Sequence, residues 1–167
     1  NIVYTGNFKF DQSSQDMYST DLSQIADLGK EGVLALLSDS GDAESQTENI
    51  SEKKVQEEVL DIFQDTSSRI IVAAVASNIL RIQQVLNAAH SSGRKVFITG
   101  KNLEAILKTA MDLDKLTLPD ENLIVPISKI DKYDDDQILI LETGSAGEPI
   151  KTLNRMATDN HDQVNIK

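Results

Sequence analysis

The distribution of apolar residues along the chain predicts short strands that alternate with amphipathic helices. Runs rich in Val, Ile and Leu that are too short for helices have the composition of buried strands, and they lie at residues 33–37, 69–75, 95–99, 123–125 and 138–141. Apolar residues at helical spacing follow Ser51, Asn78, Asn102 and Pro149. We therefore expect an α/β fold, with a mostly parallel sheet of about five strands flanked by helices in a Rossmann-like, three-layer arrangement.

The segment at residues 137–157 combines a strand, a glycine-rich loop and a helix. Its apolar run is followed by Thr143-Gly144-Ser145-Ala146-Gly147-Glu148-Pro149 and then by an amphipathic helix, whose first turn suits Pro. Such a unit directs backbone N–H groups and the positive end of a helix toward one point, where an anion is stabilised. Phosphate is the natural ligand. The alternative is a tight turn that binds nothing.

Polar residues follow several of the predicted strands. In an open parallel sheet the carboxyl ends of the strands meet at one edge, where ligands gather. We therefore expect one polar edge formed by Asp39, Ser77 and Asn78, Thr99 and Gly100, and residues 143–147. A dinucleotide site is a competing idea, but Ser-Asp-Ser follows the first of these strands instead of the glycine pattern that such a site needs.

In composition the chain is an ordinary globular protein of single-domain size. It has 167 residues, of which 40% are hydrophobic and 26% charged, and this length suffices to bury a core. No apolar run approaches the ~18 residues that a membrane-spanning helix needs, and we expect no signal peptide. The absence of cysteine excludes disulfides and thiolate metal sites. We expect a cytoplasmic location and no membrane partner.

The charge of the chain is unevenly distributed. A net charge of −11 argues against a general nucleic-acid binder, because polyanion binding needs Lys and Arg that face phosphates. Residues 1–68 hold 4 basic and 14 acidic side chains, residues 69–111 hold 6 and 1, and residues 112–167 hold 6 and 12. The middle third is therefore basic within an acidic chain. The alternative is that these charges simply occupy separate solvated faces.

Several motifs, in their order and spacing over nearly the whole chain, resemble the ribonuclease J family. They are Thr5-Gly6-Asn7-Phe8-Lys9-Phe10-Asp11, Leu36-Leu37-Ser38-Asp39-Ser40, Ala76-Ser77-Asn78-Ile79-Leu80-Arg81-Ile82-Gln83-Gln84, the 143–149 loop, and Leu153-Asn154-Arg155-Met156-Ala157. Members of that family are metal-dependent bacterial and archaeal ribonucleases, in which an inserted β-CASP domain interrupts a metallo-β-lactamase domain. The resemblance implies that residues 1–30 end one metallo-β-lactamase segment, 31–161 form the β-CASP domain, and 162–167 start the return.

The resemblance also implies two zinc ions in active members, held by His-rich motifs of the metallo-β-lactamase half. A hydrolytic zinc site needs about three or four ligands, and this chain has only His90 and His161, far apart in sequence. Surface or packing roles suit these two histidines better. We therefore expect no cofactor in residues 1–167, and no cleavage of RNA by this chain alone.

Two residues relate to that metal site through the resemblance. The family usually has an Asp that bridges both metals where this chain has Asn7, and a neutral amide cannot supply that charge. Asn7 is thus a degenerate metal position, and we expect it not to be a ligand. Asp39 matches the acidic β-CASP motif and is the candidate catalytic residue, as a carboxylate that orients a metal-ligand His. Alternatively, it caps the strand end or closes a turn.

The RNA-binding candidates lie at the predicted polar edge. Backbone and hydroxyl donors would come from Ser77, Asn78, Gly144, Ser145 and Gly147, and positive charge from Arg81, Lys101 and Arg155. Leu80 stands where the family often has His, which puts the usual substrate contacts there in doubt.

With Asn7 and Leu80 in place of the residues usual in the family, the chain resembles the second, weakly active ribonuclease J paralogue of Firmicutes, which pairs with a more active paralogue. Two interpretations stay open. In the first, the domain holds single-stranded RNA against the metal-bearing domain of a nuclease that processes and degrades RNA. In the second, the domain belongs to a scaffold or regulatory subunit with a degenerate site, which binds and stabilises an active ribonuclease J paralogue.

Overall fold

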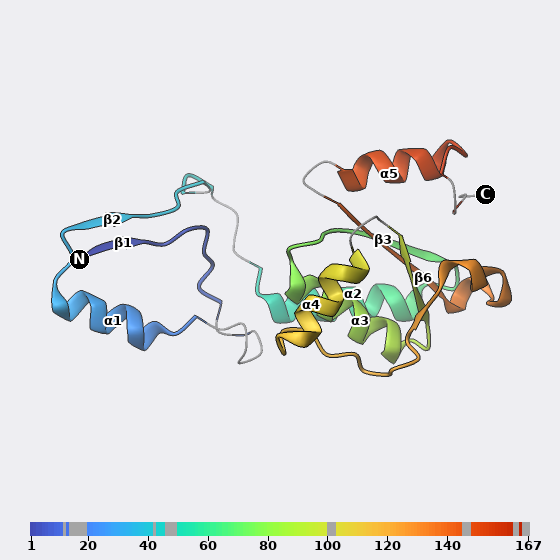
Figure 1. The fold of residues 1–167 in the computed structure, drawn as a ribbon, viewed down its shortest axis with the longest axis horizontal. Helices are drawn as coiled ribbons and strands as arrows, with labels where there is room; N and C mark the ends of the chain where they lie inside the picture. The colour runs from blue at the N-terminus through green and yellow to red at the C-terminus, as the bar shows by residue number, and fades with distance from the viewer. Residues whose placement is uncertain are drawn as a thin grey trace. The chain divides into compact units, whose positions relative to one another are not determined.

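The computed structural model of the chain describes residues 1–11, 13, 20–41, 43–45, 50–99, 103–144, 148–161 and 164. The chain forms two compact units, Asn1–Val55 and Gln56–Lys167, and each is described by itself (Figure 1). Within the described ranges, none of the helices has the length and apolar character needed to cross a membrane.

The first unit is a strand–helix–strand arrangement. Strand β1 (Ile2–Tyr4) pairs in parallel with β2 (Ala35–Leu37), and α1 (Leu22–Glu31) connects them along the chain. Asp21 begins the helix as its N-cap, since its carboxylate accepts hydrogen bonds from the backbone N–H groups of Ser23 and Gln24. The unit also contains the first residues of α2 (Glu52–Asp65).

Much of the apolar surface of this first unit is exposed. Ile2 is 66% exposed, Tyr4 77% and Leu36 63%, and none of the residues of α1 is buried. In the parallel register, Ile2 and Tyr4 lie on one face of the pair and Leu36 on the other. Parallel strands with apolar residues on both faces are normally covered on both sides. The described residues of this unit do not provide that cover.

The second unit is built on a four-stranded parallel sheet. Its strand order is β3 (Ile70–Val75), β6 (Ile138–Gly144), β4 (Lys95–Thr99) and β5 (Ile124–Val125). Strand β6 lies between β3 and β4, and its residues 138–141 are at most 1% exposed. An unbroken apolar run is what a central parallel strand requires, because both of its faces are covered.

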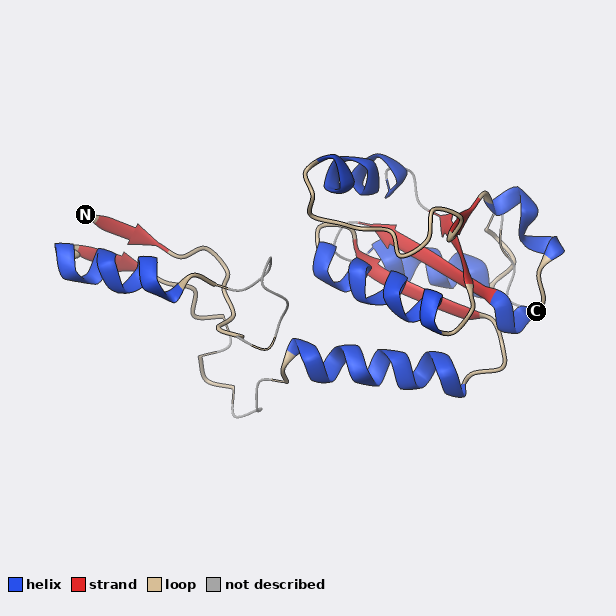
Figure 2. Cartoon of the chain, turned by 90° about the horizontal axis from the view of Figure 1, so that it is seen from below, coloured by secondary structure: helices blue, strands red, loops and turns tan. Residues whose placement is uncertain are grey.

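Helices cover both faces of this sheet. Helices α2, α3 (Ile79–Ser91) and α4 (Leu103–Asp112) pack against the face that carries Leu139 and Leu141. Helix α5 (Glu148–Ala157) packs through Met156 against the face that carries Ile138 and Ile140. The 3-10 segments η2 (Ile127–Lys132) and η3 (Asp135–Gln137) connect β5 to β6. Figure 1 shows α5 on one side of the sheet, and Figure 2 shows the strands with helices around them.

The predicted α/β class and the mostly parallel sheet are confirmed, with one correction. The expected first strand exists at β2, but it pairs with β1 and does not extend the four-stranded sheet. The apolar composition of a strand indicates that the strand is suited to burial, but it does not indicate which strand lies beside it. The pairing of β2 with β1 was therefore not predicted. The predicted domain limits at residues 30, 161 and 162 concern a larger architecture and stay predictions.

Candidate functional site

The carboxyl ends of three neighbouring strands form one edge of the second unit. Strands β3, β6 and β4 are parallel, so Val75, Gly144 and Thr99 end at the same side of the sheet. Ser77 and Asn78 follow β3 and are exposed. The predicted common edge is therefore present for β3, β4 and β6. Lys101, Ser145 and Gly147, which were predicted to join it, lie outside the described residues, as does Gly100.

Asn78 begins α3 at this edge. Its side-chain oxygen accepts a hydrogen bond of 3.0 Å from the backbone N–H of Arg81, as predicted for an N-cap residue. The Arg81 guanidinium in turn donates to the amide oxygen of Gln84 at 2.8 Å, and Gln84 is only 3% exposed. A buried amide thus restrains Arg81. Gln84 was not predicted, although a polar residue four positions from both Leu80 and Ala88 was a signal that it could lie inward.

Most cations of the basic middle third have partners within the protein. Arg69 pairs with Asp135 at 2.9 Å, Lys95 with Asp120 at 3.5 Å, and Lys108 with Asp112 at 2.7 Å. All three acidic partners come from the acidic last third of the sequence. The uneven charge of the sequence therefore does not become an equally basic surface. Arg155 lies on α5 and is exposed, and its Nε donates to the carbonyl oxygen of Asn160 at 3.3 Å.

Arg94 is a structural residue at the opposite edge of the sheet. It is 2% exposed, and its guanidinium donates to the carbonyl oxygens of Ser68 at 3.0 Å and Ile138 at 3.2 Å, and also to those of Asp135 and Thr66. Burial lowers the pKa of Arg94, and the carboxylate of Asp136 opposes this effect. The side chain therefore fixes the segments that lead into β3 and β6, and it is not available to RNA.

A buried polar pair lies at the carboxyl edge. Thr99 is 3% exposed and Glu142 4%, and the two face each other directly in the register of β4 and β6. The Thr99 hydroxyl donates a hydrogen bond to Oε2 of Glu142. Sequence analysis placed Thr99 at this edge but missed Glu142, because a single Glu after an apolar run resembles the exposed end of a strand.

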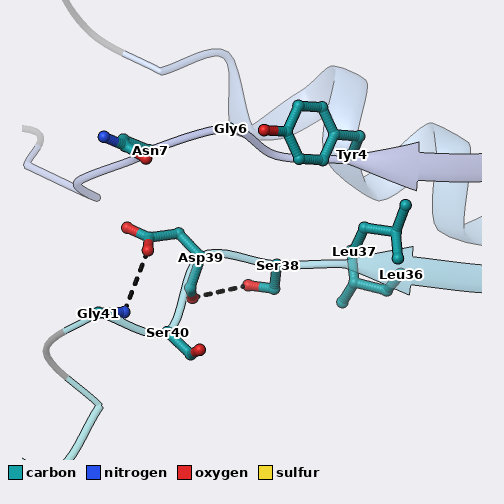
Figure 3. A pocket seen from close by; sticks show the side chains of 9 residues that line it. All are labelled: Tyr4, Gly6, Asn7, Leu36, Leu37, Ser38, Asp39, Ser40 and Gly41. Carbon is teal, nitrogen blue, oxygen red and sulfur yellow. Dashed lines mark hydrogen bonds between the residues drawn. The ribbon is translucent and has the colours of Figure 1, made fainter.

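An open hollow of ≈ 520 Å³ occupies the corresponding edge of the first unit. It is lined by Tyr4, Gly6, Asn7, Leu36, Leu37, Ser38, Asp39, Ser40 and Gly41 (Figure 3). The backbone N–H of Thr5 donates to the carbonyl oxygen of Leu37 at 3.0 Å, and the backbone N–H of Asp39 donates to the Thr5 hydroxyl oxygen at 3.1 Å. These bonds hold together the loops that follow β1 and β2. Asn7 and Asp39, the two residues predicted near a metal site, therefore line one hollow.

The Asp39 carboxylate closes a tight turn within this hollow. Its Oδ1 accepts a hydrogen bond of 3.1 Å from the backbone N–H of Gly41. Figure 3 shows the carboxylate on the side of its loop that faces the loop of Asn7, and both side chains are exposed. The turn role that was weighed for Asp39 is thus present, and Oδ2 stays available for a second contact. The expectation that Asp39 shares an edge with Ser77 and Thr99 was wrong, because β2 belongs to the other sheet.

Comparison with known proteins identifies the family. The family model described as "Ribonuclease J, beta-CASP domain" matches residues 67–167. The chain belongs to the ribonuclease J family. It is 50% identical over its whole length to "Ribonuclease J 2" of Streptococcus pyogenes serotype M3, and 40% identical over 99% of its length to "Ribonuclease J 2" of Staphylococcus aureus. The chain spans 30% of the length of each of these relatives.

The described residues of this ribonuclease J chain do not fit a zinc centre by themselves. They contain no group of three or more His, Cys, Asp or Glu side chains that could hold a metal ion. The hollow supplies one carboxylate, from Asp39, and the neutral amide of Asn7. His90 is exposed near the end of α3, and Nδ1 of His161 accepts a hydrogen bond of 3.1 Å from the backbone N–H of Val164. These groups are too few for the three or four ligands of a hydrolytic zinc site.

Proposed function

We propose that the second unit binds the backbone of single-stranded RNA, as the β-CASP domain of a ribonuclease J-type nuclease in RNA processing and decay. Phosphodiester hydrolysis, both 5′ to 3′ exonucleolytic and endonucleolytic, would take place at a two-zinc site in another domain of the natural protein. The observation that carries this proposal is the shared edge of β3, β6 and β4, beside the Asn78-capped start of α3.

Helix geometry supports phosphate contacts at this edge. Helices α3, α4 and α5 each begin shortly after a strand that ends there, and the first N–H groups of a helix have no partner within the helix. Those groups and the positive end of the helix dipole favour an anion. Ser77, Asn78, Gly144, Ser145 and Gly147 are the proposed contacts, with charge from Arg81, Lys101 and Arg155.

Electrostatics limit the strength of this contact. Among the described cations of the middle third, Arg69, Lys95 and Lys108 are paired with carboxylates. Arg69 and Lys95 also lie at the amino ends of β3 and β4, so few of these cations are left to neutralise phosphates at the carboxyl edge. Counterion release should therefore be small, and the RNA affinity of this unit should be weak and should fall as the salt concentration rises. Tight binding would need the facing surface of the metal-bearing domain as well.

The test replaces loop residues in the full-length natural protein. We expect Ser145→Leu combined with Gly147→Val to lower the affinity for single-stranded RNA, because bulky side chains keep a phosphate away from the N–H groups. Ser68→Leu, before β3 and at the opposite edge, is the matched control and should bind RNA normally. Affinity measured by titration at low and moderate salt that does not change in the loop variant would remove the RNA assignment.

A second function is favoured by Asn7, whose amide lines the hollow where a carboxylate would attract cations. In this alternative, the natural protein is a scaffold or regulatory subunit that binds and stabilises an active ribonuclease J paralogue. It predicts that affinity for the paralogue survives the loop changes, whereas the first proposal predicts a loss of RNA binding. Measuring both affinities on the same variants separates the two functions. Either function places the protein in the cytoplasm, where RNA decay takes place.

A further inference from the structure

The side chain of Glu142 lies where an open parallel sheet is most suited to bind a ligand. The helices that follow β3 and β4 pack on one face of the sheet, whereas α5, which follows β6, packs on the other. Strand β6 lies between β3 and β4, so neighbouring connections leave this edge in opposite directions. Ligands of open parallel sheets bind outside the carboxyl ends of the strands at such a switch point, and Glu142 is two residues from the end of β6.

The chemistry of this position is that of a hydrogen-bond acceptor. One carboxylate oxygen of Glu142 accepts from the Thr99 hydroxyl, and among the described residues the other oxygen has no hydrogen-bond partner. Ala73, the register partner of Glu142 on β3, has a small side chain. Glu142 is 4% exposed as a residue, yet among the described residues the fully buried side-chain atom without a hydrogen-bond partner is Nε of Arg94. The second oxygen of Glu142 therefore reaches the surface at this edge, where a ligand can contact it.

A phosphate would not occupy this position, because the carboxylate repels it. Phosphates are better placed beside β3, where Asn78 begins α3, which is one strand away from β6. The group over Glu142 and Thr99 must donate a hydrogen bond to satisfy the carboxylate. Within a nucleotide the donors are the ribose hydroxyls and the N–H groups of the base. Carboxylates at the ends of parallel strands bind ribose hydroxyls in other nucleotide sites.

We propose that Glu142, held by Thr99, accepts a hydrogen bond from a nucleoside of the bound RNA and thereby selects among nucleic acids. This inference rests on the proposed RNA-binding function. The donor is either the ribose 2′-hydroxyl, which would distinguish RNA from DNA, or the 2-amino group of guanine. Glu142 would contribute to specificity, whereas the N-terminal ends of the helices at this edge would contribute most of the affinity for the RNA backbone.

The experiment uses Glu142→Leu in the full-length natural protein and three single-stranded probes of equal length. The probes are an RNA, the same sequence as DNA, and the same RNA with inosine in place of guanosine, which lacks the amino group. If the ribose is the donor, we expect the unmodified protein to prefer RNA over DNA, and the variant to lose about tenfold of that preference. If the base is the donor, the loss appears instead in the preference for guanosine over inosine.

Two controls separate recognition from structure. Glu121→Leu removes the same charge from an exposed position before β5, at the opposite edge of the sheet, and it should leave both preferences unchanged. Thr99→Val removes the hydroxyl that holds the carboxylate and should lower the same preference as Glu142→Leu, to a smaller extent. The unfolding temperature of Glu142→Leu should change little, because an apolar side chain of similar size replaces a carboxylate that is mostly removed from water.

Three outcomes would overturn the inference, and they have different meanings. If Glu142→Leu keeps both preferences while RNA binding persists, Glu142 recognises no nucleoside, although the proposed function stands. If the variant unfolds at a lower temperature and loses affinity for all probes equally, the Thr99 and Glu142 pair only stabilises the sheet. If the unmodified protein binds none of the probes, the proposed function fails together with the inference.

Discussion

Asp11 accepts a hydrogen bond of 2.5 Å from the backbone N–H of Glu52, a residue 41 positions further along the chain. Lys9 lies beside it and donates to the carbonyl oxygen of Ile50 at 2.7 Å and to the carboxylate of Glu52 at 3.0 Å. The segment that follows Asn7 therefore caps the first turn of α2 with a carboxylate, which the helix dipole favours. This contact gives a structural role to the last residue of the Thr5–Asp11 motif.

The Asp11 contact should depend on pH in a defined window. Hydrogen bonds from the Ser13 hydroxyl and from the backbone N–H groups of Glu52 and Ser13 lower the pKa of Asp11 from 3.8 to about 2. A depressed pKa in the folded state means that the contact stabilises the fold fully above about pH 4 and loses this effect as the pH falls toward 2.

The measurement is a pH titration of the Glu52 backbone amide by NMR. We expect its chemical shift to change with a midpoint near that low pKa. In Asp11→Asn this low-pH step should disappear, while the N-terminal cap of α1 at Asp21 serves as an internal reference. A midpoint near 3.8 would contradict the hydrogen bonds described for Asp11.

Arg94 should be among the positions of the second unit where a substitution lowers stability most. Arg94→Met leaves buried carbonyl oxygens without donors, and we expect the free energy of opening for β3 and β6 to fall by about 3 kcal/mol. Native-state hydrogen exchange of the amides of these strands measures this quantity. Arg69→Met, which breaks the exposed ion pair with Asp135, is the control and should cost less than about 1 kcal/mol. Equal effects of the two changes would contradict the structural role of Arg94.

Residues 1–167 alone should bind no zinc and cleave no RNA. The reason is chemical, since the hollow supplies the carboxylate of Asp39 and the amide of Asn7, which is fewer ligands than zinc hydrolysis requires. Elemental analysis and incubation with 5′-monophosphorylated RNA test the two parts of this prediction. Stoichiometric zinc together with cleavage that a chelator abolishes would show that the chain assembles a centre of its own.

Restoring a carboxylate at position 7 should strengthen metal binding in the full-length natural protein, provided that the His ligands of the other domain are present. Asn7→Asp adds a negative charge to the hollow that already contains Asp39, and we expect higher metal occupancy or faster RNA cleavage. Ser40→Asp adds the same charge to another residue that lines the hollow and should have a smaller effect. If Asn7→Asp folds normally and gains in neither quantity, Asn7 is not what limits the site.

The sequence by itself determined the class of the fold and most of its strands. The predicted strand at residues 95–99 matches β4, and the apolar run at 138–141 became the buried centre of β6. Asn78 caps α3 as its side chain predicted. These features are local, because periodicity, short apolar runs and capping side chains act within a few neighbouring residues. The motifs likewise sufficed to indicate the ribonuclease J family, which the comparisons confirmed.

Only the tertiary structure decided which segments became neighbours. Because β2 pairs with β1, Asp39 follows a strand of the two-stranded sheet and lines a hollow with Asn7. Cations of the basic middle third form ion pairs with carboxylates of the last third, as Arg69 does with Asp135. Arg94 and Glu142 became buried although both side chains are charged. Such contacts join residues tens of positions apart, and their cost or benefit depends on desolvation and on partners that no local pattern records.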